Sequence, residues 1–252
     1  MNLSQNGSAK NKKQLSIILA TFNESPNILK MFESLTNVLP SSIDGEIIVV
    51  DDNSPDGTGT IVENYIKTRT NESPFIKIIH RINERGLSSA IIEGFNSANS
   101  EMILVMDTDF AHPPEKILEM LDEMKNNQYD IIIGSRFVKG GKTIGWPLSR
   151  RLMSAFATKI AKYGLGLQAK DSTSGFFLIK KNLIENKKFD AIGSKLLLEI
   201  LVKTYGVTIK EIPYTCINRE FGSSKFNTSI ISDYFKLVRR LYKYEKSHQK
   251  FN

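Results

Sequence analysis

The chain has 252 residues and a formal net charge of +7, a length that can bury a substantial core in one large α/β domain, with or without an appendage. The basic balance is compatible with partners that carry phosphate groups, namely nucleotides, nucleic acids or an anionic membrane surface, and does not choose between them. The single cysteine, Cys216, excludes an internal disulfide framework and indicates a reducing compartment, and no group of Cys and His residues has the spacing of a zinc site.

Residues 1–14 begin the chain with a polar and basic segment that lacks the apolar core of a signal peptide. We predict that this arm is disordered. Nowhere does the sequence approach the roughly 20 apolar residues that span a bilayer. The most apolar helical run, Leu196–Val202, is interrupted by Glu199, so no transmembrane segment is expected.

Short apolar runs alternate with helical patterns through the first half of the chain. The runs are rich in β-branched residues and are predicted strands: Leu15–Ala20, Glu46–Val50, Phe75–His80, Met102–Met106 and Asp130–Ser135. The predicted helices between them cover 26–38, with Ser25 as N-cap and Pro26 at the first helical position, then 59–68, 86–98 and 114–126. This alternation predicts an α/β fold with a mainly parallel central sheet flanked by helices.

After Gly141 the pattern becomes irregular. The predicted elements are a long amphipathic helix from Pro147 to about Gly164, a strand over Ser174–Lys181, a helix over Ser194–Gly206, an edge strand over Thr208–Ile217, a loop over Asn218–Lys225 and a helical tail. The strand is assigned to an edge because Pro213 cannot donate a hydrogen bond to a neighbour. We therefore divide the chain into an arm (1–14), a single catalytic domain (15–226) and a basic amphipathic helix or tail (227–252).

Polar and acidic groups follow four of the predicted strands. They lie in Ala20–Glu24, Asp51–Thr58, Asp107–His112 and Ser135–Gly141. Ligands of such sheets bind beyond the carboxyl ends of the strands, so these segments should share one crevice. Asp107 and Asp109 repel each other unless a cation compensates, and magnesium favours one or two carboxylates together with phosphate oxygens. A bare pair of this kind can be two solvated loop acids, but the shared crevice favours a metal site.

The segment Asp51–Thr58 contains Asn, Ser, Pro and Gly residues that suit a turn between strand and helix. Asp51 and Asp52 could equally accept hydrogen bonds from a base or a ribose. No G-x-G-x-x-G follows the first strand and no G-x-x-x-x-G-K-[ST] occurs in the chain, which disfavours a Rossmann cofactor and a P-loop nucleotide.

Eight segments in order carry a resemblance to a known family. They read ATFNE, EIIVVDDNSPDGT, RGLSSAIIEGF, MDTDFAHPP, GSRFVKGGK, GWPLSRR, DSTSGFFLIKK and REFGSSK, and extend from about Leu15 to Lys225, about four fifths of the chain. Together they resemble the polyprenol (dolichol) phosphate mannosyltransferases, which are inverting glycosyltransferases of family 2 with the GT-A fold. The resemblance implies a Rossmann-like α/β domain.

The resemblance also implies roles for individual residues. The nucleotide sugar would be held by Ala20, Phe22, Glu24, Val50, Asp52, Asp107, Thr108, Asp109, Arg219 and Lys225, the last two closing over the donor phosphates. A divalent metal, Mg²⁺ or Mn²⁺, would bind the pair Asp107 and Asp109, with Asp109 as the direct ligand. The lipid phosphate would be received by Arg136, Arg150 and Ser154, which with Asp109 form the catalytic set.

Three positions depart from the family pattern. Ala20 and Phe22 stand where proline and tyrosine are frequent, so the ring remains and the hydroxyl is lost. Ala111 stands where some members supply a glutamine ligand, so water or another group must complete the metal site. A lipid monophosphate is already ionised near neutral pH, which explains why no catalytic base is evident and why arginines suit the acceptor site. The metal and fixed cations would stabilise charge on the departing diphosphate.

The resemblance implies transfer of mannose from GDP-mannose to dolichyl or polyprenyl phosphate with inversion, giving polyprenyl phosphate β-mannose, a lipid-linked donor for protein glycosylation, and GDP. The nearest alternative is a polyprenyl-phosphate β-glucosyltransferase that uses UDP-glucose. A nucleotide-sugar-binding module without catalysis is a second, against which Asp107, Asp109, Arg219 and Lys225 argue. Nucleic-acid binding is disfavoured, because no recognisable motif accompanies the basic charge.

The tail from Ser229 to Lys246 has an amphipathic helical pattern. Its apolar face comprises Ile231, Tyr234, Phe235, Val238, Leu241 and Tyr242, and its basic residues are Lys236, Arg239, Arg240, Lys243 and Lys246. Such a helix can lie in the lipid headgroup layer, or its apolar face can pack on the catalytic domain or on a separate membrane-anchoring subunit. We expect a cytoplasmic protein, peripheral on the cytoplasmic face of a membrane. His112 could support the metal loop, although an ordinary loop position before Pro113 is the simpler interpretation.

Overall fold

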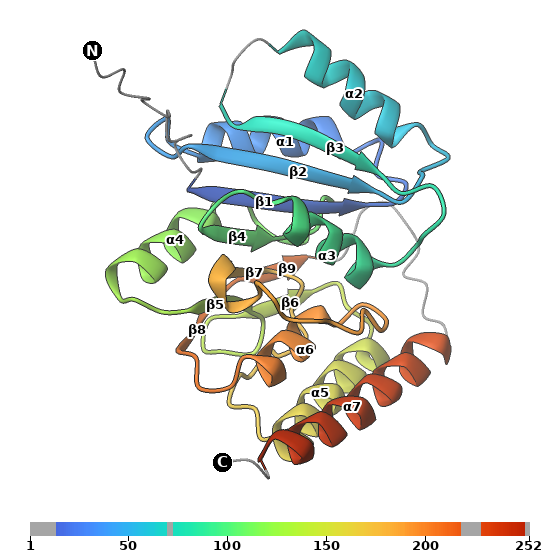
Figure 1. Ribbon diagram of the computed structural model, residues 1–252, viewed down its shortest axis with the longest axis vertical. Coiled ribbons are helices and arrows are strands. Elements are labelled where there is room, and N and C mark those ends of the chain that lie inside the picture. Colours follow the sequence, from blue (N-terminus) through green and yellow to red (C-terminus); the bar gives the residue numbers. More distant parts are fainter. Residues whose placement is uncertain (1–13, 70–72, 218–227, 250–252) are drawn as a thin grey trace, which may run out of the picture.

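The computed structural model describes residues 14–69, 73–217 and 228–249. Its centre is a seven-stranded sheet with the order β3-β2-β1-β4-β7-β5-β8, accompanied by a two-stranded sheet of β6 and β9 (Figure 1). Apart from Gln14, the predicted arm lies outside the described residues. The predicted loop over Asn218–Lys225, including Arg219 and Lys225, also lies outside them.

The strands are β1 Leu15–Thr21, β2 Gly45–Asp51, β3 Phe75–His80, β4 Met102–Val105, β5 Ile131–Ser135, β6 Lys142–Ile144, β7 Phe177–Lys180, β8 Ile209–Pro213 and β9 Thr215–Ile217. The helices are α1 Ile28–Val38, α2 Thr58–Thr68, α3 Leu87–Ser97, α4 Lys116–Asn126, α5 Leu148–Gly164, α6 Leu196–Lys203, α7 Thr228–Gln249 and the 3-10 helix η1 Lys181–Leu183. The predicted strands and helices of the first half are confirmed within a few residues at their ends.

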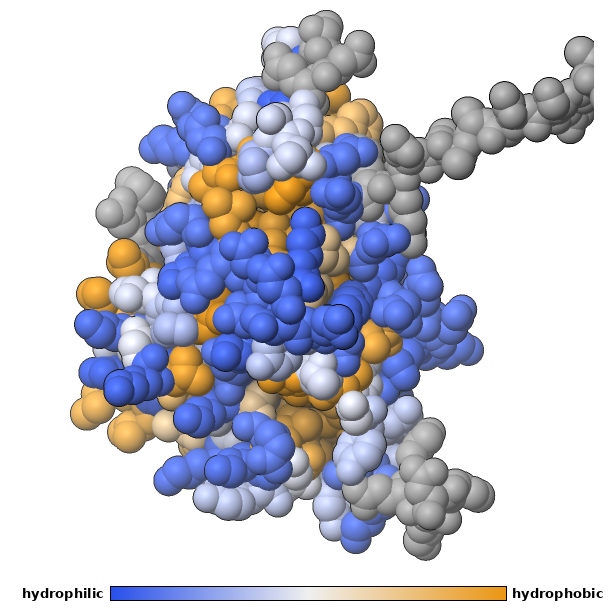
Figure 2. Space-filling model, turned by 90° about the vertical axis from the view of Figure 1, so that its left-hand side faces the viewer, coloured by the Kyte–Doolittle hydropathy of each residue, from blue (hydrophilic) through white to orange (hydrophobic). Residues whose placement is uncertain are grey.

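The two faces of the sheet carry separate hydrophobic cores, because successive side chains of a strand point to opposite faces. Ile17 and Leu19 of β1 pack in the core that α1, α2 and α4 complete. Ile18, between them, packs in the core formed with α3 and α6. Figure 2 shows the side of the molecule on which α4 lies, where hydrophilic residues surround smaller hydrophobic areas. Strands covered on both faces explain the continuous apolar runs in the sequence.

Strand β7 interrupts the parallel order of the sheet. It pairs antiparallel with β4 on one side, where Leu104 lies opposite Leu178, and with β5 on the other, where Ile132 lies opposite the same residue. The other strand pairs of the sheet are parallel. The prediction of a mainly parallel sheet flanked by helices is therefore confirmed.

The second half of the chain differs from the sequence prediction in two of its strands. The edge strand expected over 208–217 is two strands, separated at Tyr214. Strand β8 is the edge of the main sheet, with Pro213 opposite Ser135, whereas β9 pairs with β6, a strand that the sequence did not indicate. Tyr214 is buried in the core, and its backbone N–H donates to Ser135 O while its own carbonyl accepts from Lys142 N. Burial of this ring directs the chain from one sheet into the other.

The first helix also begins later than expected. Helix α1 begins at Ile28, not at Pro26, because residues 25–27 form a turn. Ser25, the expected N-cap, belongs to this turn, and its backbone N–H donates to the Asp56 carboxylate at 3.0 Å. This bond joins the loop after β1 to the loop after β2.

Helix α7 packs against α5 and α6, and the two helices α5 and α7 lie side by side (Figure 1). Leu237 and Leu241 are buried with Ala161 of α5 and Leu198 of α6. Tyr234 Oη donates to Ala157 O at 2.6 Å. Tyr234, Val238 and Leu241 of the predicted apolar face thus pack within the chain, which is the second of the two alternatives for the tail. Leu237, which the predicted face left out, is buried with them.

Part of that face remains accessible to solvent. Phe235 is 49% exposed and Tyr242 is 44% exposed. Among the residues described, no helix combines the length and the apolar character needed to cross a membrane.

We predict that Leu241→Ala lowers the free energy of unfolding by about 3 kcal/mol, because it leaves a cavity between α5, α6 and α7. Urea denaturation followed by circular dichroism measures this change. The matched control is Phe235→Ala on the same helix, for which we expect a loss below about 1 kcal/mol. Equal losses for the two variants would contradict the packing of α7 described above.

Candidate active site

The loops after β1 and β2 are tied together by hydrogen bonds. Asp51 accepts from Thr21 Oγ1 at 3.0 Å and from the backbone N–H of Ser54 at 2.9 Å. Asn23 N donates to Ser54 Oγ, and Glu24 N donates to Thr58 Oγ1. Asp51 therefore organises the turn that its sequence context suggested.

A small pocket of about 90 Å³ opens beside these loops. It is lined by Ala20, Thr21, Phe22, Asp52, Leu87 and Ala90. Three of the residues predicted to hold the nucleotide, Ala20, Phe22 and Asp52, thus line one pocket. The guanidinium of Arg85 lies 5.0 Å from the centroid of the Phe22 ring. Val50 is different, because its side chain is fully buried in the core and can offer only its backbone to a ligand.

Asp52 is held by an arginine that the sequence analysis did not identify. Arg81 Nη1 lies 3.0 Å from Asp52 Oδ1, and both side chains are largely buried. The other carboxylate oxygen accepts from the backbone N–H of Gly86 at 2.8 Å. Arg81 also donates to Gly86 O and to Ser89 Oγ. The pair fixes the segment that enters α3, which forms one wall of the pocket.

The loop after β4 carries Asp107 and Asp109 and is organised by His112. The backbone N–H of Asp107 donates to His112 Nδ1 at 2.9 Å, which places the proton of the neutral ring on Nε2. The His112 ring is buried and stacks on Phe176, with 5.2 Å between the ring centroids. Asp109 Oδ1 accepts from Ala111 N at 3.1 Å. The structure therefore gives His112 a supporting contact to the acidic loop. Its sequence signal was the histidine three residues after Asp109.

The donor set of this loop fits a hard divalent cation. Asp107 and Asp109 offer carboxylate oxygens, the ligands that Mg²⁺ and Mn²⁺ prefer. Within the described residues, no group of three or more His, Cys, Asp or Glu side chains gathers to hold a metal. Ala111 packs in the core and Thr108 is buried. Such a metal would depend on water or substrate oxygens for its remaining ligands.

Arg136, directly after β5, is fixed by a buried aspartate. Its Nε and Nη2 donate to the two carboxylate oxygens of Asp171 at 2.7 and 2.6 Å, and its backbone N–H donates to the same group at 2.9 Å. Asp171 is fully buried. Burial alone would lower the pKa of Arg136, but the hydrogen bonds and the charge of Asp171 outweigh it and raise the pKa. Asp171 lies in the segment DSTSG, but no local pattern of the sequence indicated that Arg136 is its partner.

The two arginines predicted to receive the lipid phosphate meet at one aromatic ring. The Cζ atoms of Arg150 and Arg136 lie 3.9 and 5.2 Å from the centroid of Trp146. Ser154 follows Arg150 by one turn of α5, which places it on the same side of the helix. The structure thus brings Arg136 and Arg150 together.

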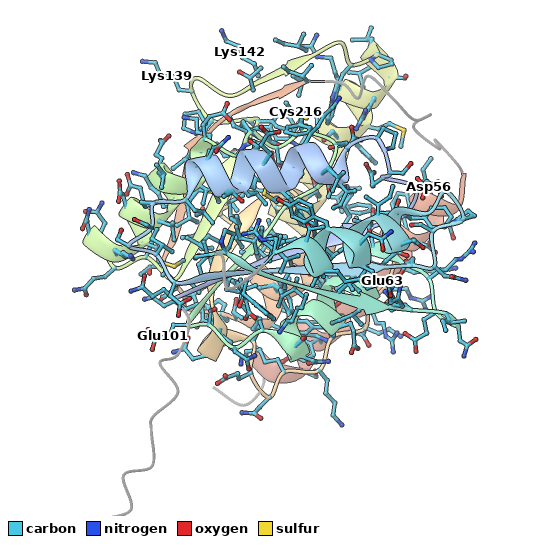
Figure 3. All side chains as sticks on the ribbon, turned by 90° about the horizontal axis from the view of Figure 1, so that it is seen from above. Asp56, Glu63, Glu101, Lys139, Lys142 and Cys216 are labelled. Atoms are coloured by element: carbon cyan, nitrogen blue, oxygen red, sulfur yellow. The ribbon has the colours of Figure 1, made fainter. Side chains whose placement is uncertain are left out.

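A cavity of about 470 Å³ adjoins this cluster. Its lining includes Arg136, Phe137, Lys142, Ile144, Trp146 and Arg151. Lys139 and Lys142 project outward from the loop and strand that follow Arg136 (Figure 3). The cavity combines cationic groups with aromatic and aliphatic surface.

The segment Asp171–Gly175, which leads into β7, contacts both halves of the site. Asp171 at its start binds Arg136. At its end, a methyl group built on Gly175 would lie 3.8 Å from Asp107 Oδ1 and 3.3 Å from His112 Cε1. An acidic loop suited to a metal therefore lies one short segment away from a cationic cluster suited to phosphate, beside a pocket open at the ends of β1 and β2.

The fold is that of the nucleotide-sugar-dependent glycosyltransferases with the GT-A architecture. Glucosyl-3-phosphoglycerate synthase from Mycobacterium tuberculosis, solved with UDP, superimposes with a TM-score of 0.64 at 14% identity and covers 90% of this chain and 80% of its own. A mannosyltransferase from Pyrobaculum calidifontis, solved with GDP-Man and Mn²⁺, superimposes with a TM-score of 0.62 at 15% identity. This superposition covers 92% of this chain and 65% of the Pyrobaculum chain.

The chain belongs to glycosyl transferase family 2, whose sequence profile matches residues 16–186. The dolichol-phosphate mannosyltransferase of Pyrococcus furiosus is 39% identical over 92% of this chain and 64% of its own length. The undecaprenyl-phosphate mannosyltransferase of Micrococcus luteus is 33% identical over 86% of this chain and 88% of its own length. The dolichol-phosphate mannosyltransferase of Saccharomyces cerevisiae is 32% identical over 91% of this chain and 87% of its own length. The chain is therefore a glycosyltransferase, and the resemblance seen in the motifs is confirmed.

We predict that Asp171→Asn lowers the free energy of unfolding by about 3 kcal/mol, because it leaves the buried Arg136 guanidinium without its counter-charge. Chemical denaturation measures the change. Asp130→Asn is the matched control, since Asp130 pairs with Lys180 at 2.8 Å in a partly exposed place and should lose under about 1 kcal/mol. A loss for Asp171→Asn no larger than for the control would show that Arg136 does not depend on this partner.

Proposed function

We propose that the protein transfers mannose from GDP-mannose to a dolichyl or other polyprenyl phosphate, with inversion at the sugar, giving polyprenyl phosphate β-mannose and GDP. The product would serve as a lipid-linked donor for protein glycosylation. The observation that carries this proposal is the placement of a two-carboxylate loop next to a pair of arginines, in a chain 32–39% identical to polyprenyl-phosphate mannosyltransferases. The chain spans 64% of the length of the Pyrococcus relative.

On the donor side, Ala20, Phe22 and Asp52 would border the nucleotide, with Glu24 and the backbone of Val50 beside them. Thr108 lies between the two acidic residues and would contribute its backbone. Arg219 and Lys225, outside the described residues, remain predicted to close over the donor phosphates. These cations would stabilise the charge that grows on the departing GDP.

Asp107 and Asp109 would hold a divalent cation, with Asp109 as the direct ligand. Such a cation, Mg²⁺ or Mn²⁺, neutralises charge on a diphosphate leaving group when it is bound. The support comes from the oxygen donor set and from the Pyrobaculum mannosyltransferase, which was solved with Mn²⁺. His112 keeps the Asp107 backbone in place through the hydrogen bond to its Nδ1.

On the acceptor side, Arg136, Arg150 and Ser154 would receive the lipid phosphate. A phosphate monoester is ionised near neutral pH, so its oxygen can attack the sugar carbon without a protein base. The site then needs to orient that oxygen and exclude water from it. Arg136 makes a bidentate contact with the buried Asp171 carboxylate, so it is preorganised for this task and needs no rearrangement when the phosphate arrives.

The acceptor lies in a membrane, and we propose that the protein reaches it as a peripheral protein on the cytoplasmic face. Leu148, Leu152 and Phe156 recur every four residues along α5 and are 70, 62 and 58% exposed. They belong to the same helix as Arg150 and Ser154. A separate membrane-anchoring subunit would be a further partner, and no nucleic acid is expected.

A donor panel tests the function. Purified protein is mixed with a polyprenyl phosphate and either GDP-mannose or UDP-glucose, and the lipid products are identified by mass spectrometry. We expect mannosyl phospholipid from GDP-mannose. Glucosyl lipid from UDP-glucose would replace the proposal by the glucosyltransferase alternative, and nucleotide-sugar binding without any product would indicate a binding module.

We predict that Asp109→Asn abolishes metal-dependent transfer in a folded protein, with a loss of about a hundredfold or more, because a neutral amide is a poor ligand for a hard cation. Initial rates across a manganese titration measure the effect, and dialysis against a chelator should remove wild-type activity reversibly. Asp122→Asn, on the exposed side of α4, is the control and should leave the rate unchanged. Full activity of metal-free protein would reject the assignment.

A further inference from the structure

Trp146 is the single tryptophan of the chain, and neither the motif comparison nor the proposed reaction gives it a role. Its ring contacts both arginines of the proposed acceptor side. The Arg150 guanidinium carbon is 3.9 Å from the ring centroid, and that of Arg136 is 5.2 Å away. Arg136 has a second aromatic neighbour, Phe137, also at 5.2 Å. The indole is the group that both arginines share.

The indole is held firmly in place. It is partly buried and packs against the core cluster that contains Phe176, Tyr214 and Cys216. Gly145 before it has φ 74°, a conformation that favours glycine, and Pro147 after it is the N-cap of α5. The position of the ring is thus set by its contact with the core and by the backbone conformation of the residues on either side of Trp146.

Two guanidinium groups that converge on one phosphate repel each other before the phosphate arrives. Asp171 compensates the charge of Arg136 through its bidentate contact. For Arg150, the negative face of the indole at 3.9 Å supplies a favourable cation–π contact. The ring therefore offsets part of the repulsion and keeps both cations close to one side chain, which itself lines the cavity of about 470 Å³ together with Arg136.

We propose that Trp146 is a positioning residue for the acceptor phosphate, because its ring holds Arg136 and Arg150 in the arrangement that receives it. This inference rests on the proposed function, since it assumes that a phosphate binds these arginines. It adds a residue to the proposed acceptor site and makes that site observable, because all of the tryptophan fluorescence of the protein then comes from it.

The kinetic test compares Trp146→Leu, which removes the aromatic face, with Trp146→Phe, which keeps a ring. For Trp146→Leu we expect the KM for a short, soluble polyprenyl phosphate to rise about tenfold, the size of effect typical of a desolvated cation–π contact. The KM for GDP-mannose should change less than twofold. Trp146→Phe should recover most of the loss, because the Nε1–H of Trp146 is buried without a hydrogen-bond partner among the described residues.

A double-mutant cycle with Arg150→Ala separates positioning from general loss of structure. If the ring acts through Arg150, Trp146→Leu should have little further effect in the Arg150→Ala background. Tyr163→Leu, which changes an exposed aromatic residue of the same helix, is the control and should leave both KM values unchanged. Multiplicative effects of the two substitutions, or an equal rise of both KM values, would overturn the proposal.

Fluorescence provides a binding readout that does not require turnover or a core substitution. Arg150→Ala should alter the emission of the free protein, because it removes a cation from the indole face. Titration of the wild type with the short polyprenyl phosphate should give a saturable change, while inorganic phosphate shows whether the head group suffices. If Trp146→Leu does not fold, this fluorescence measurement tests the role of Trp146 in its place. An emission that Arg150→Ala leaves unchanged would overturn the proposal.

The two ideas fail in different ways. If Arg136→Ala and Arg150→Ala raise the KM for the lipid phosphate while folded Trp146→Leu does not, the role of Trp146 is wrong and the proposed function stands. If the wild type neither uses a lipid phosphate nor changes its fluorescence with it, the proposed acceptor is wrong and the role of Trp146 is overturned with it.

Discussion

The antiparallel insertion of β7 between β4 and β5 is the constraint on which the site depends. The strand is hydrogen-bonded to both neighbours, so the segment that precedes it, Asp171–Gly175, has a fixed path across the carboxyl edge of the sheet. One end of this segment binds Arg136 and the other lies against Asp107 and His112. The acidic loop with Asp107 and the guanidinium of Arg136 therefore keep a defined separation, as the proposed transfer between two bound substrates requires.

Buried ion pairs recur at this edge of the sheet. Arg81 pairs with Asp52 beside the small pocket that Asp52 helps to line, and Arg136 pairs with Asp171 next to the larger cavity. Replacement of such pairs by apolar residues often costs no stability, so their value lies in holding charged groups at fixed places. In the proposed reaction, fixed arginines lower the reorganisation needed as charge moves from the acceptor to the leaving group.

Helices α5 and α7 form a layer beside the candidate site. Helix α5 carries Arg150 and Ser154 but buries fully only Ala161, so little of its own surface anchors it to the sheet. The contacts of α7, through Leu237, Leu241 and Tyr234, supply the missing support. Leu148, Leu152 and Phe156 are left exposed on the helix that carries Arg150, where we propose that the lipid chain of the acceptor leaves the site.

The sequence alone determined the α/β class, the first five strands, most helices and the acidic loop after β4, because burial on both faces and helical periodicity are local signals. It could not supply the pairing of β6 with β9, the partner of Arg136 or the contact of His112 with Asp107. Asp171 lies 35 positions after Arg136, and Trp146 meets Arg136 although several residues and strand β6 separate them in the sequence. Such contacts depend on the path of the backbone, which local patterns of hydrophobicity and charge leave open, and only the tertiary structure decided them.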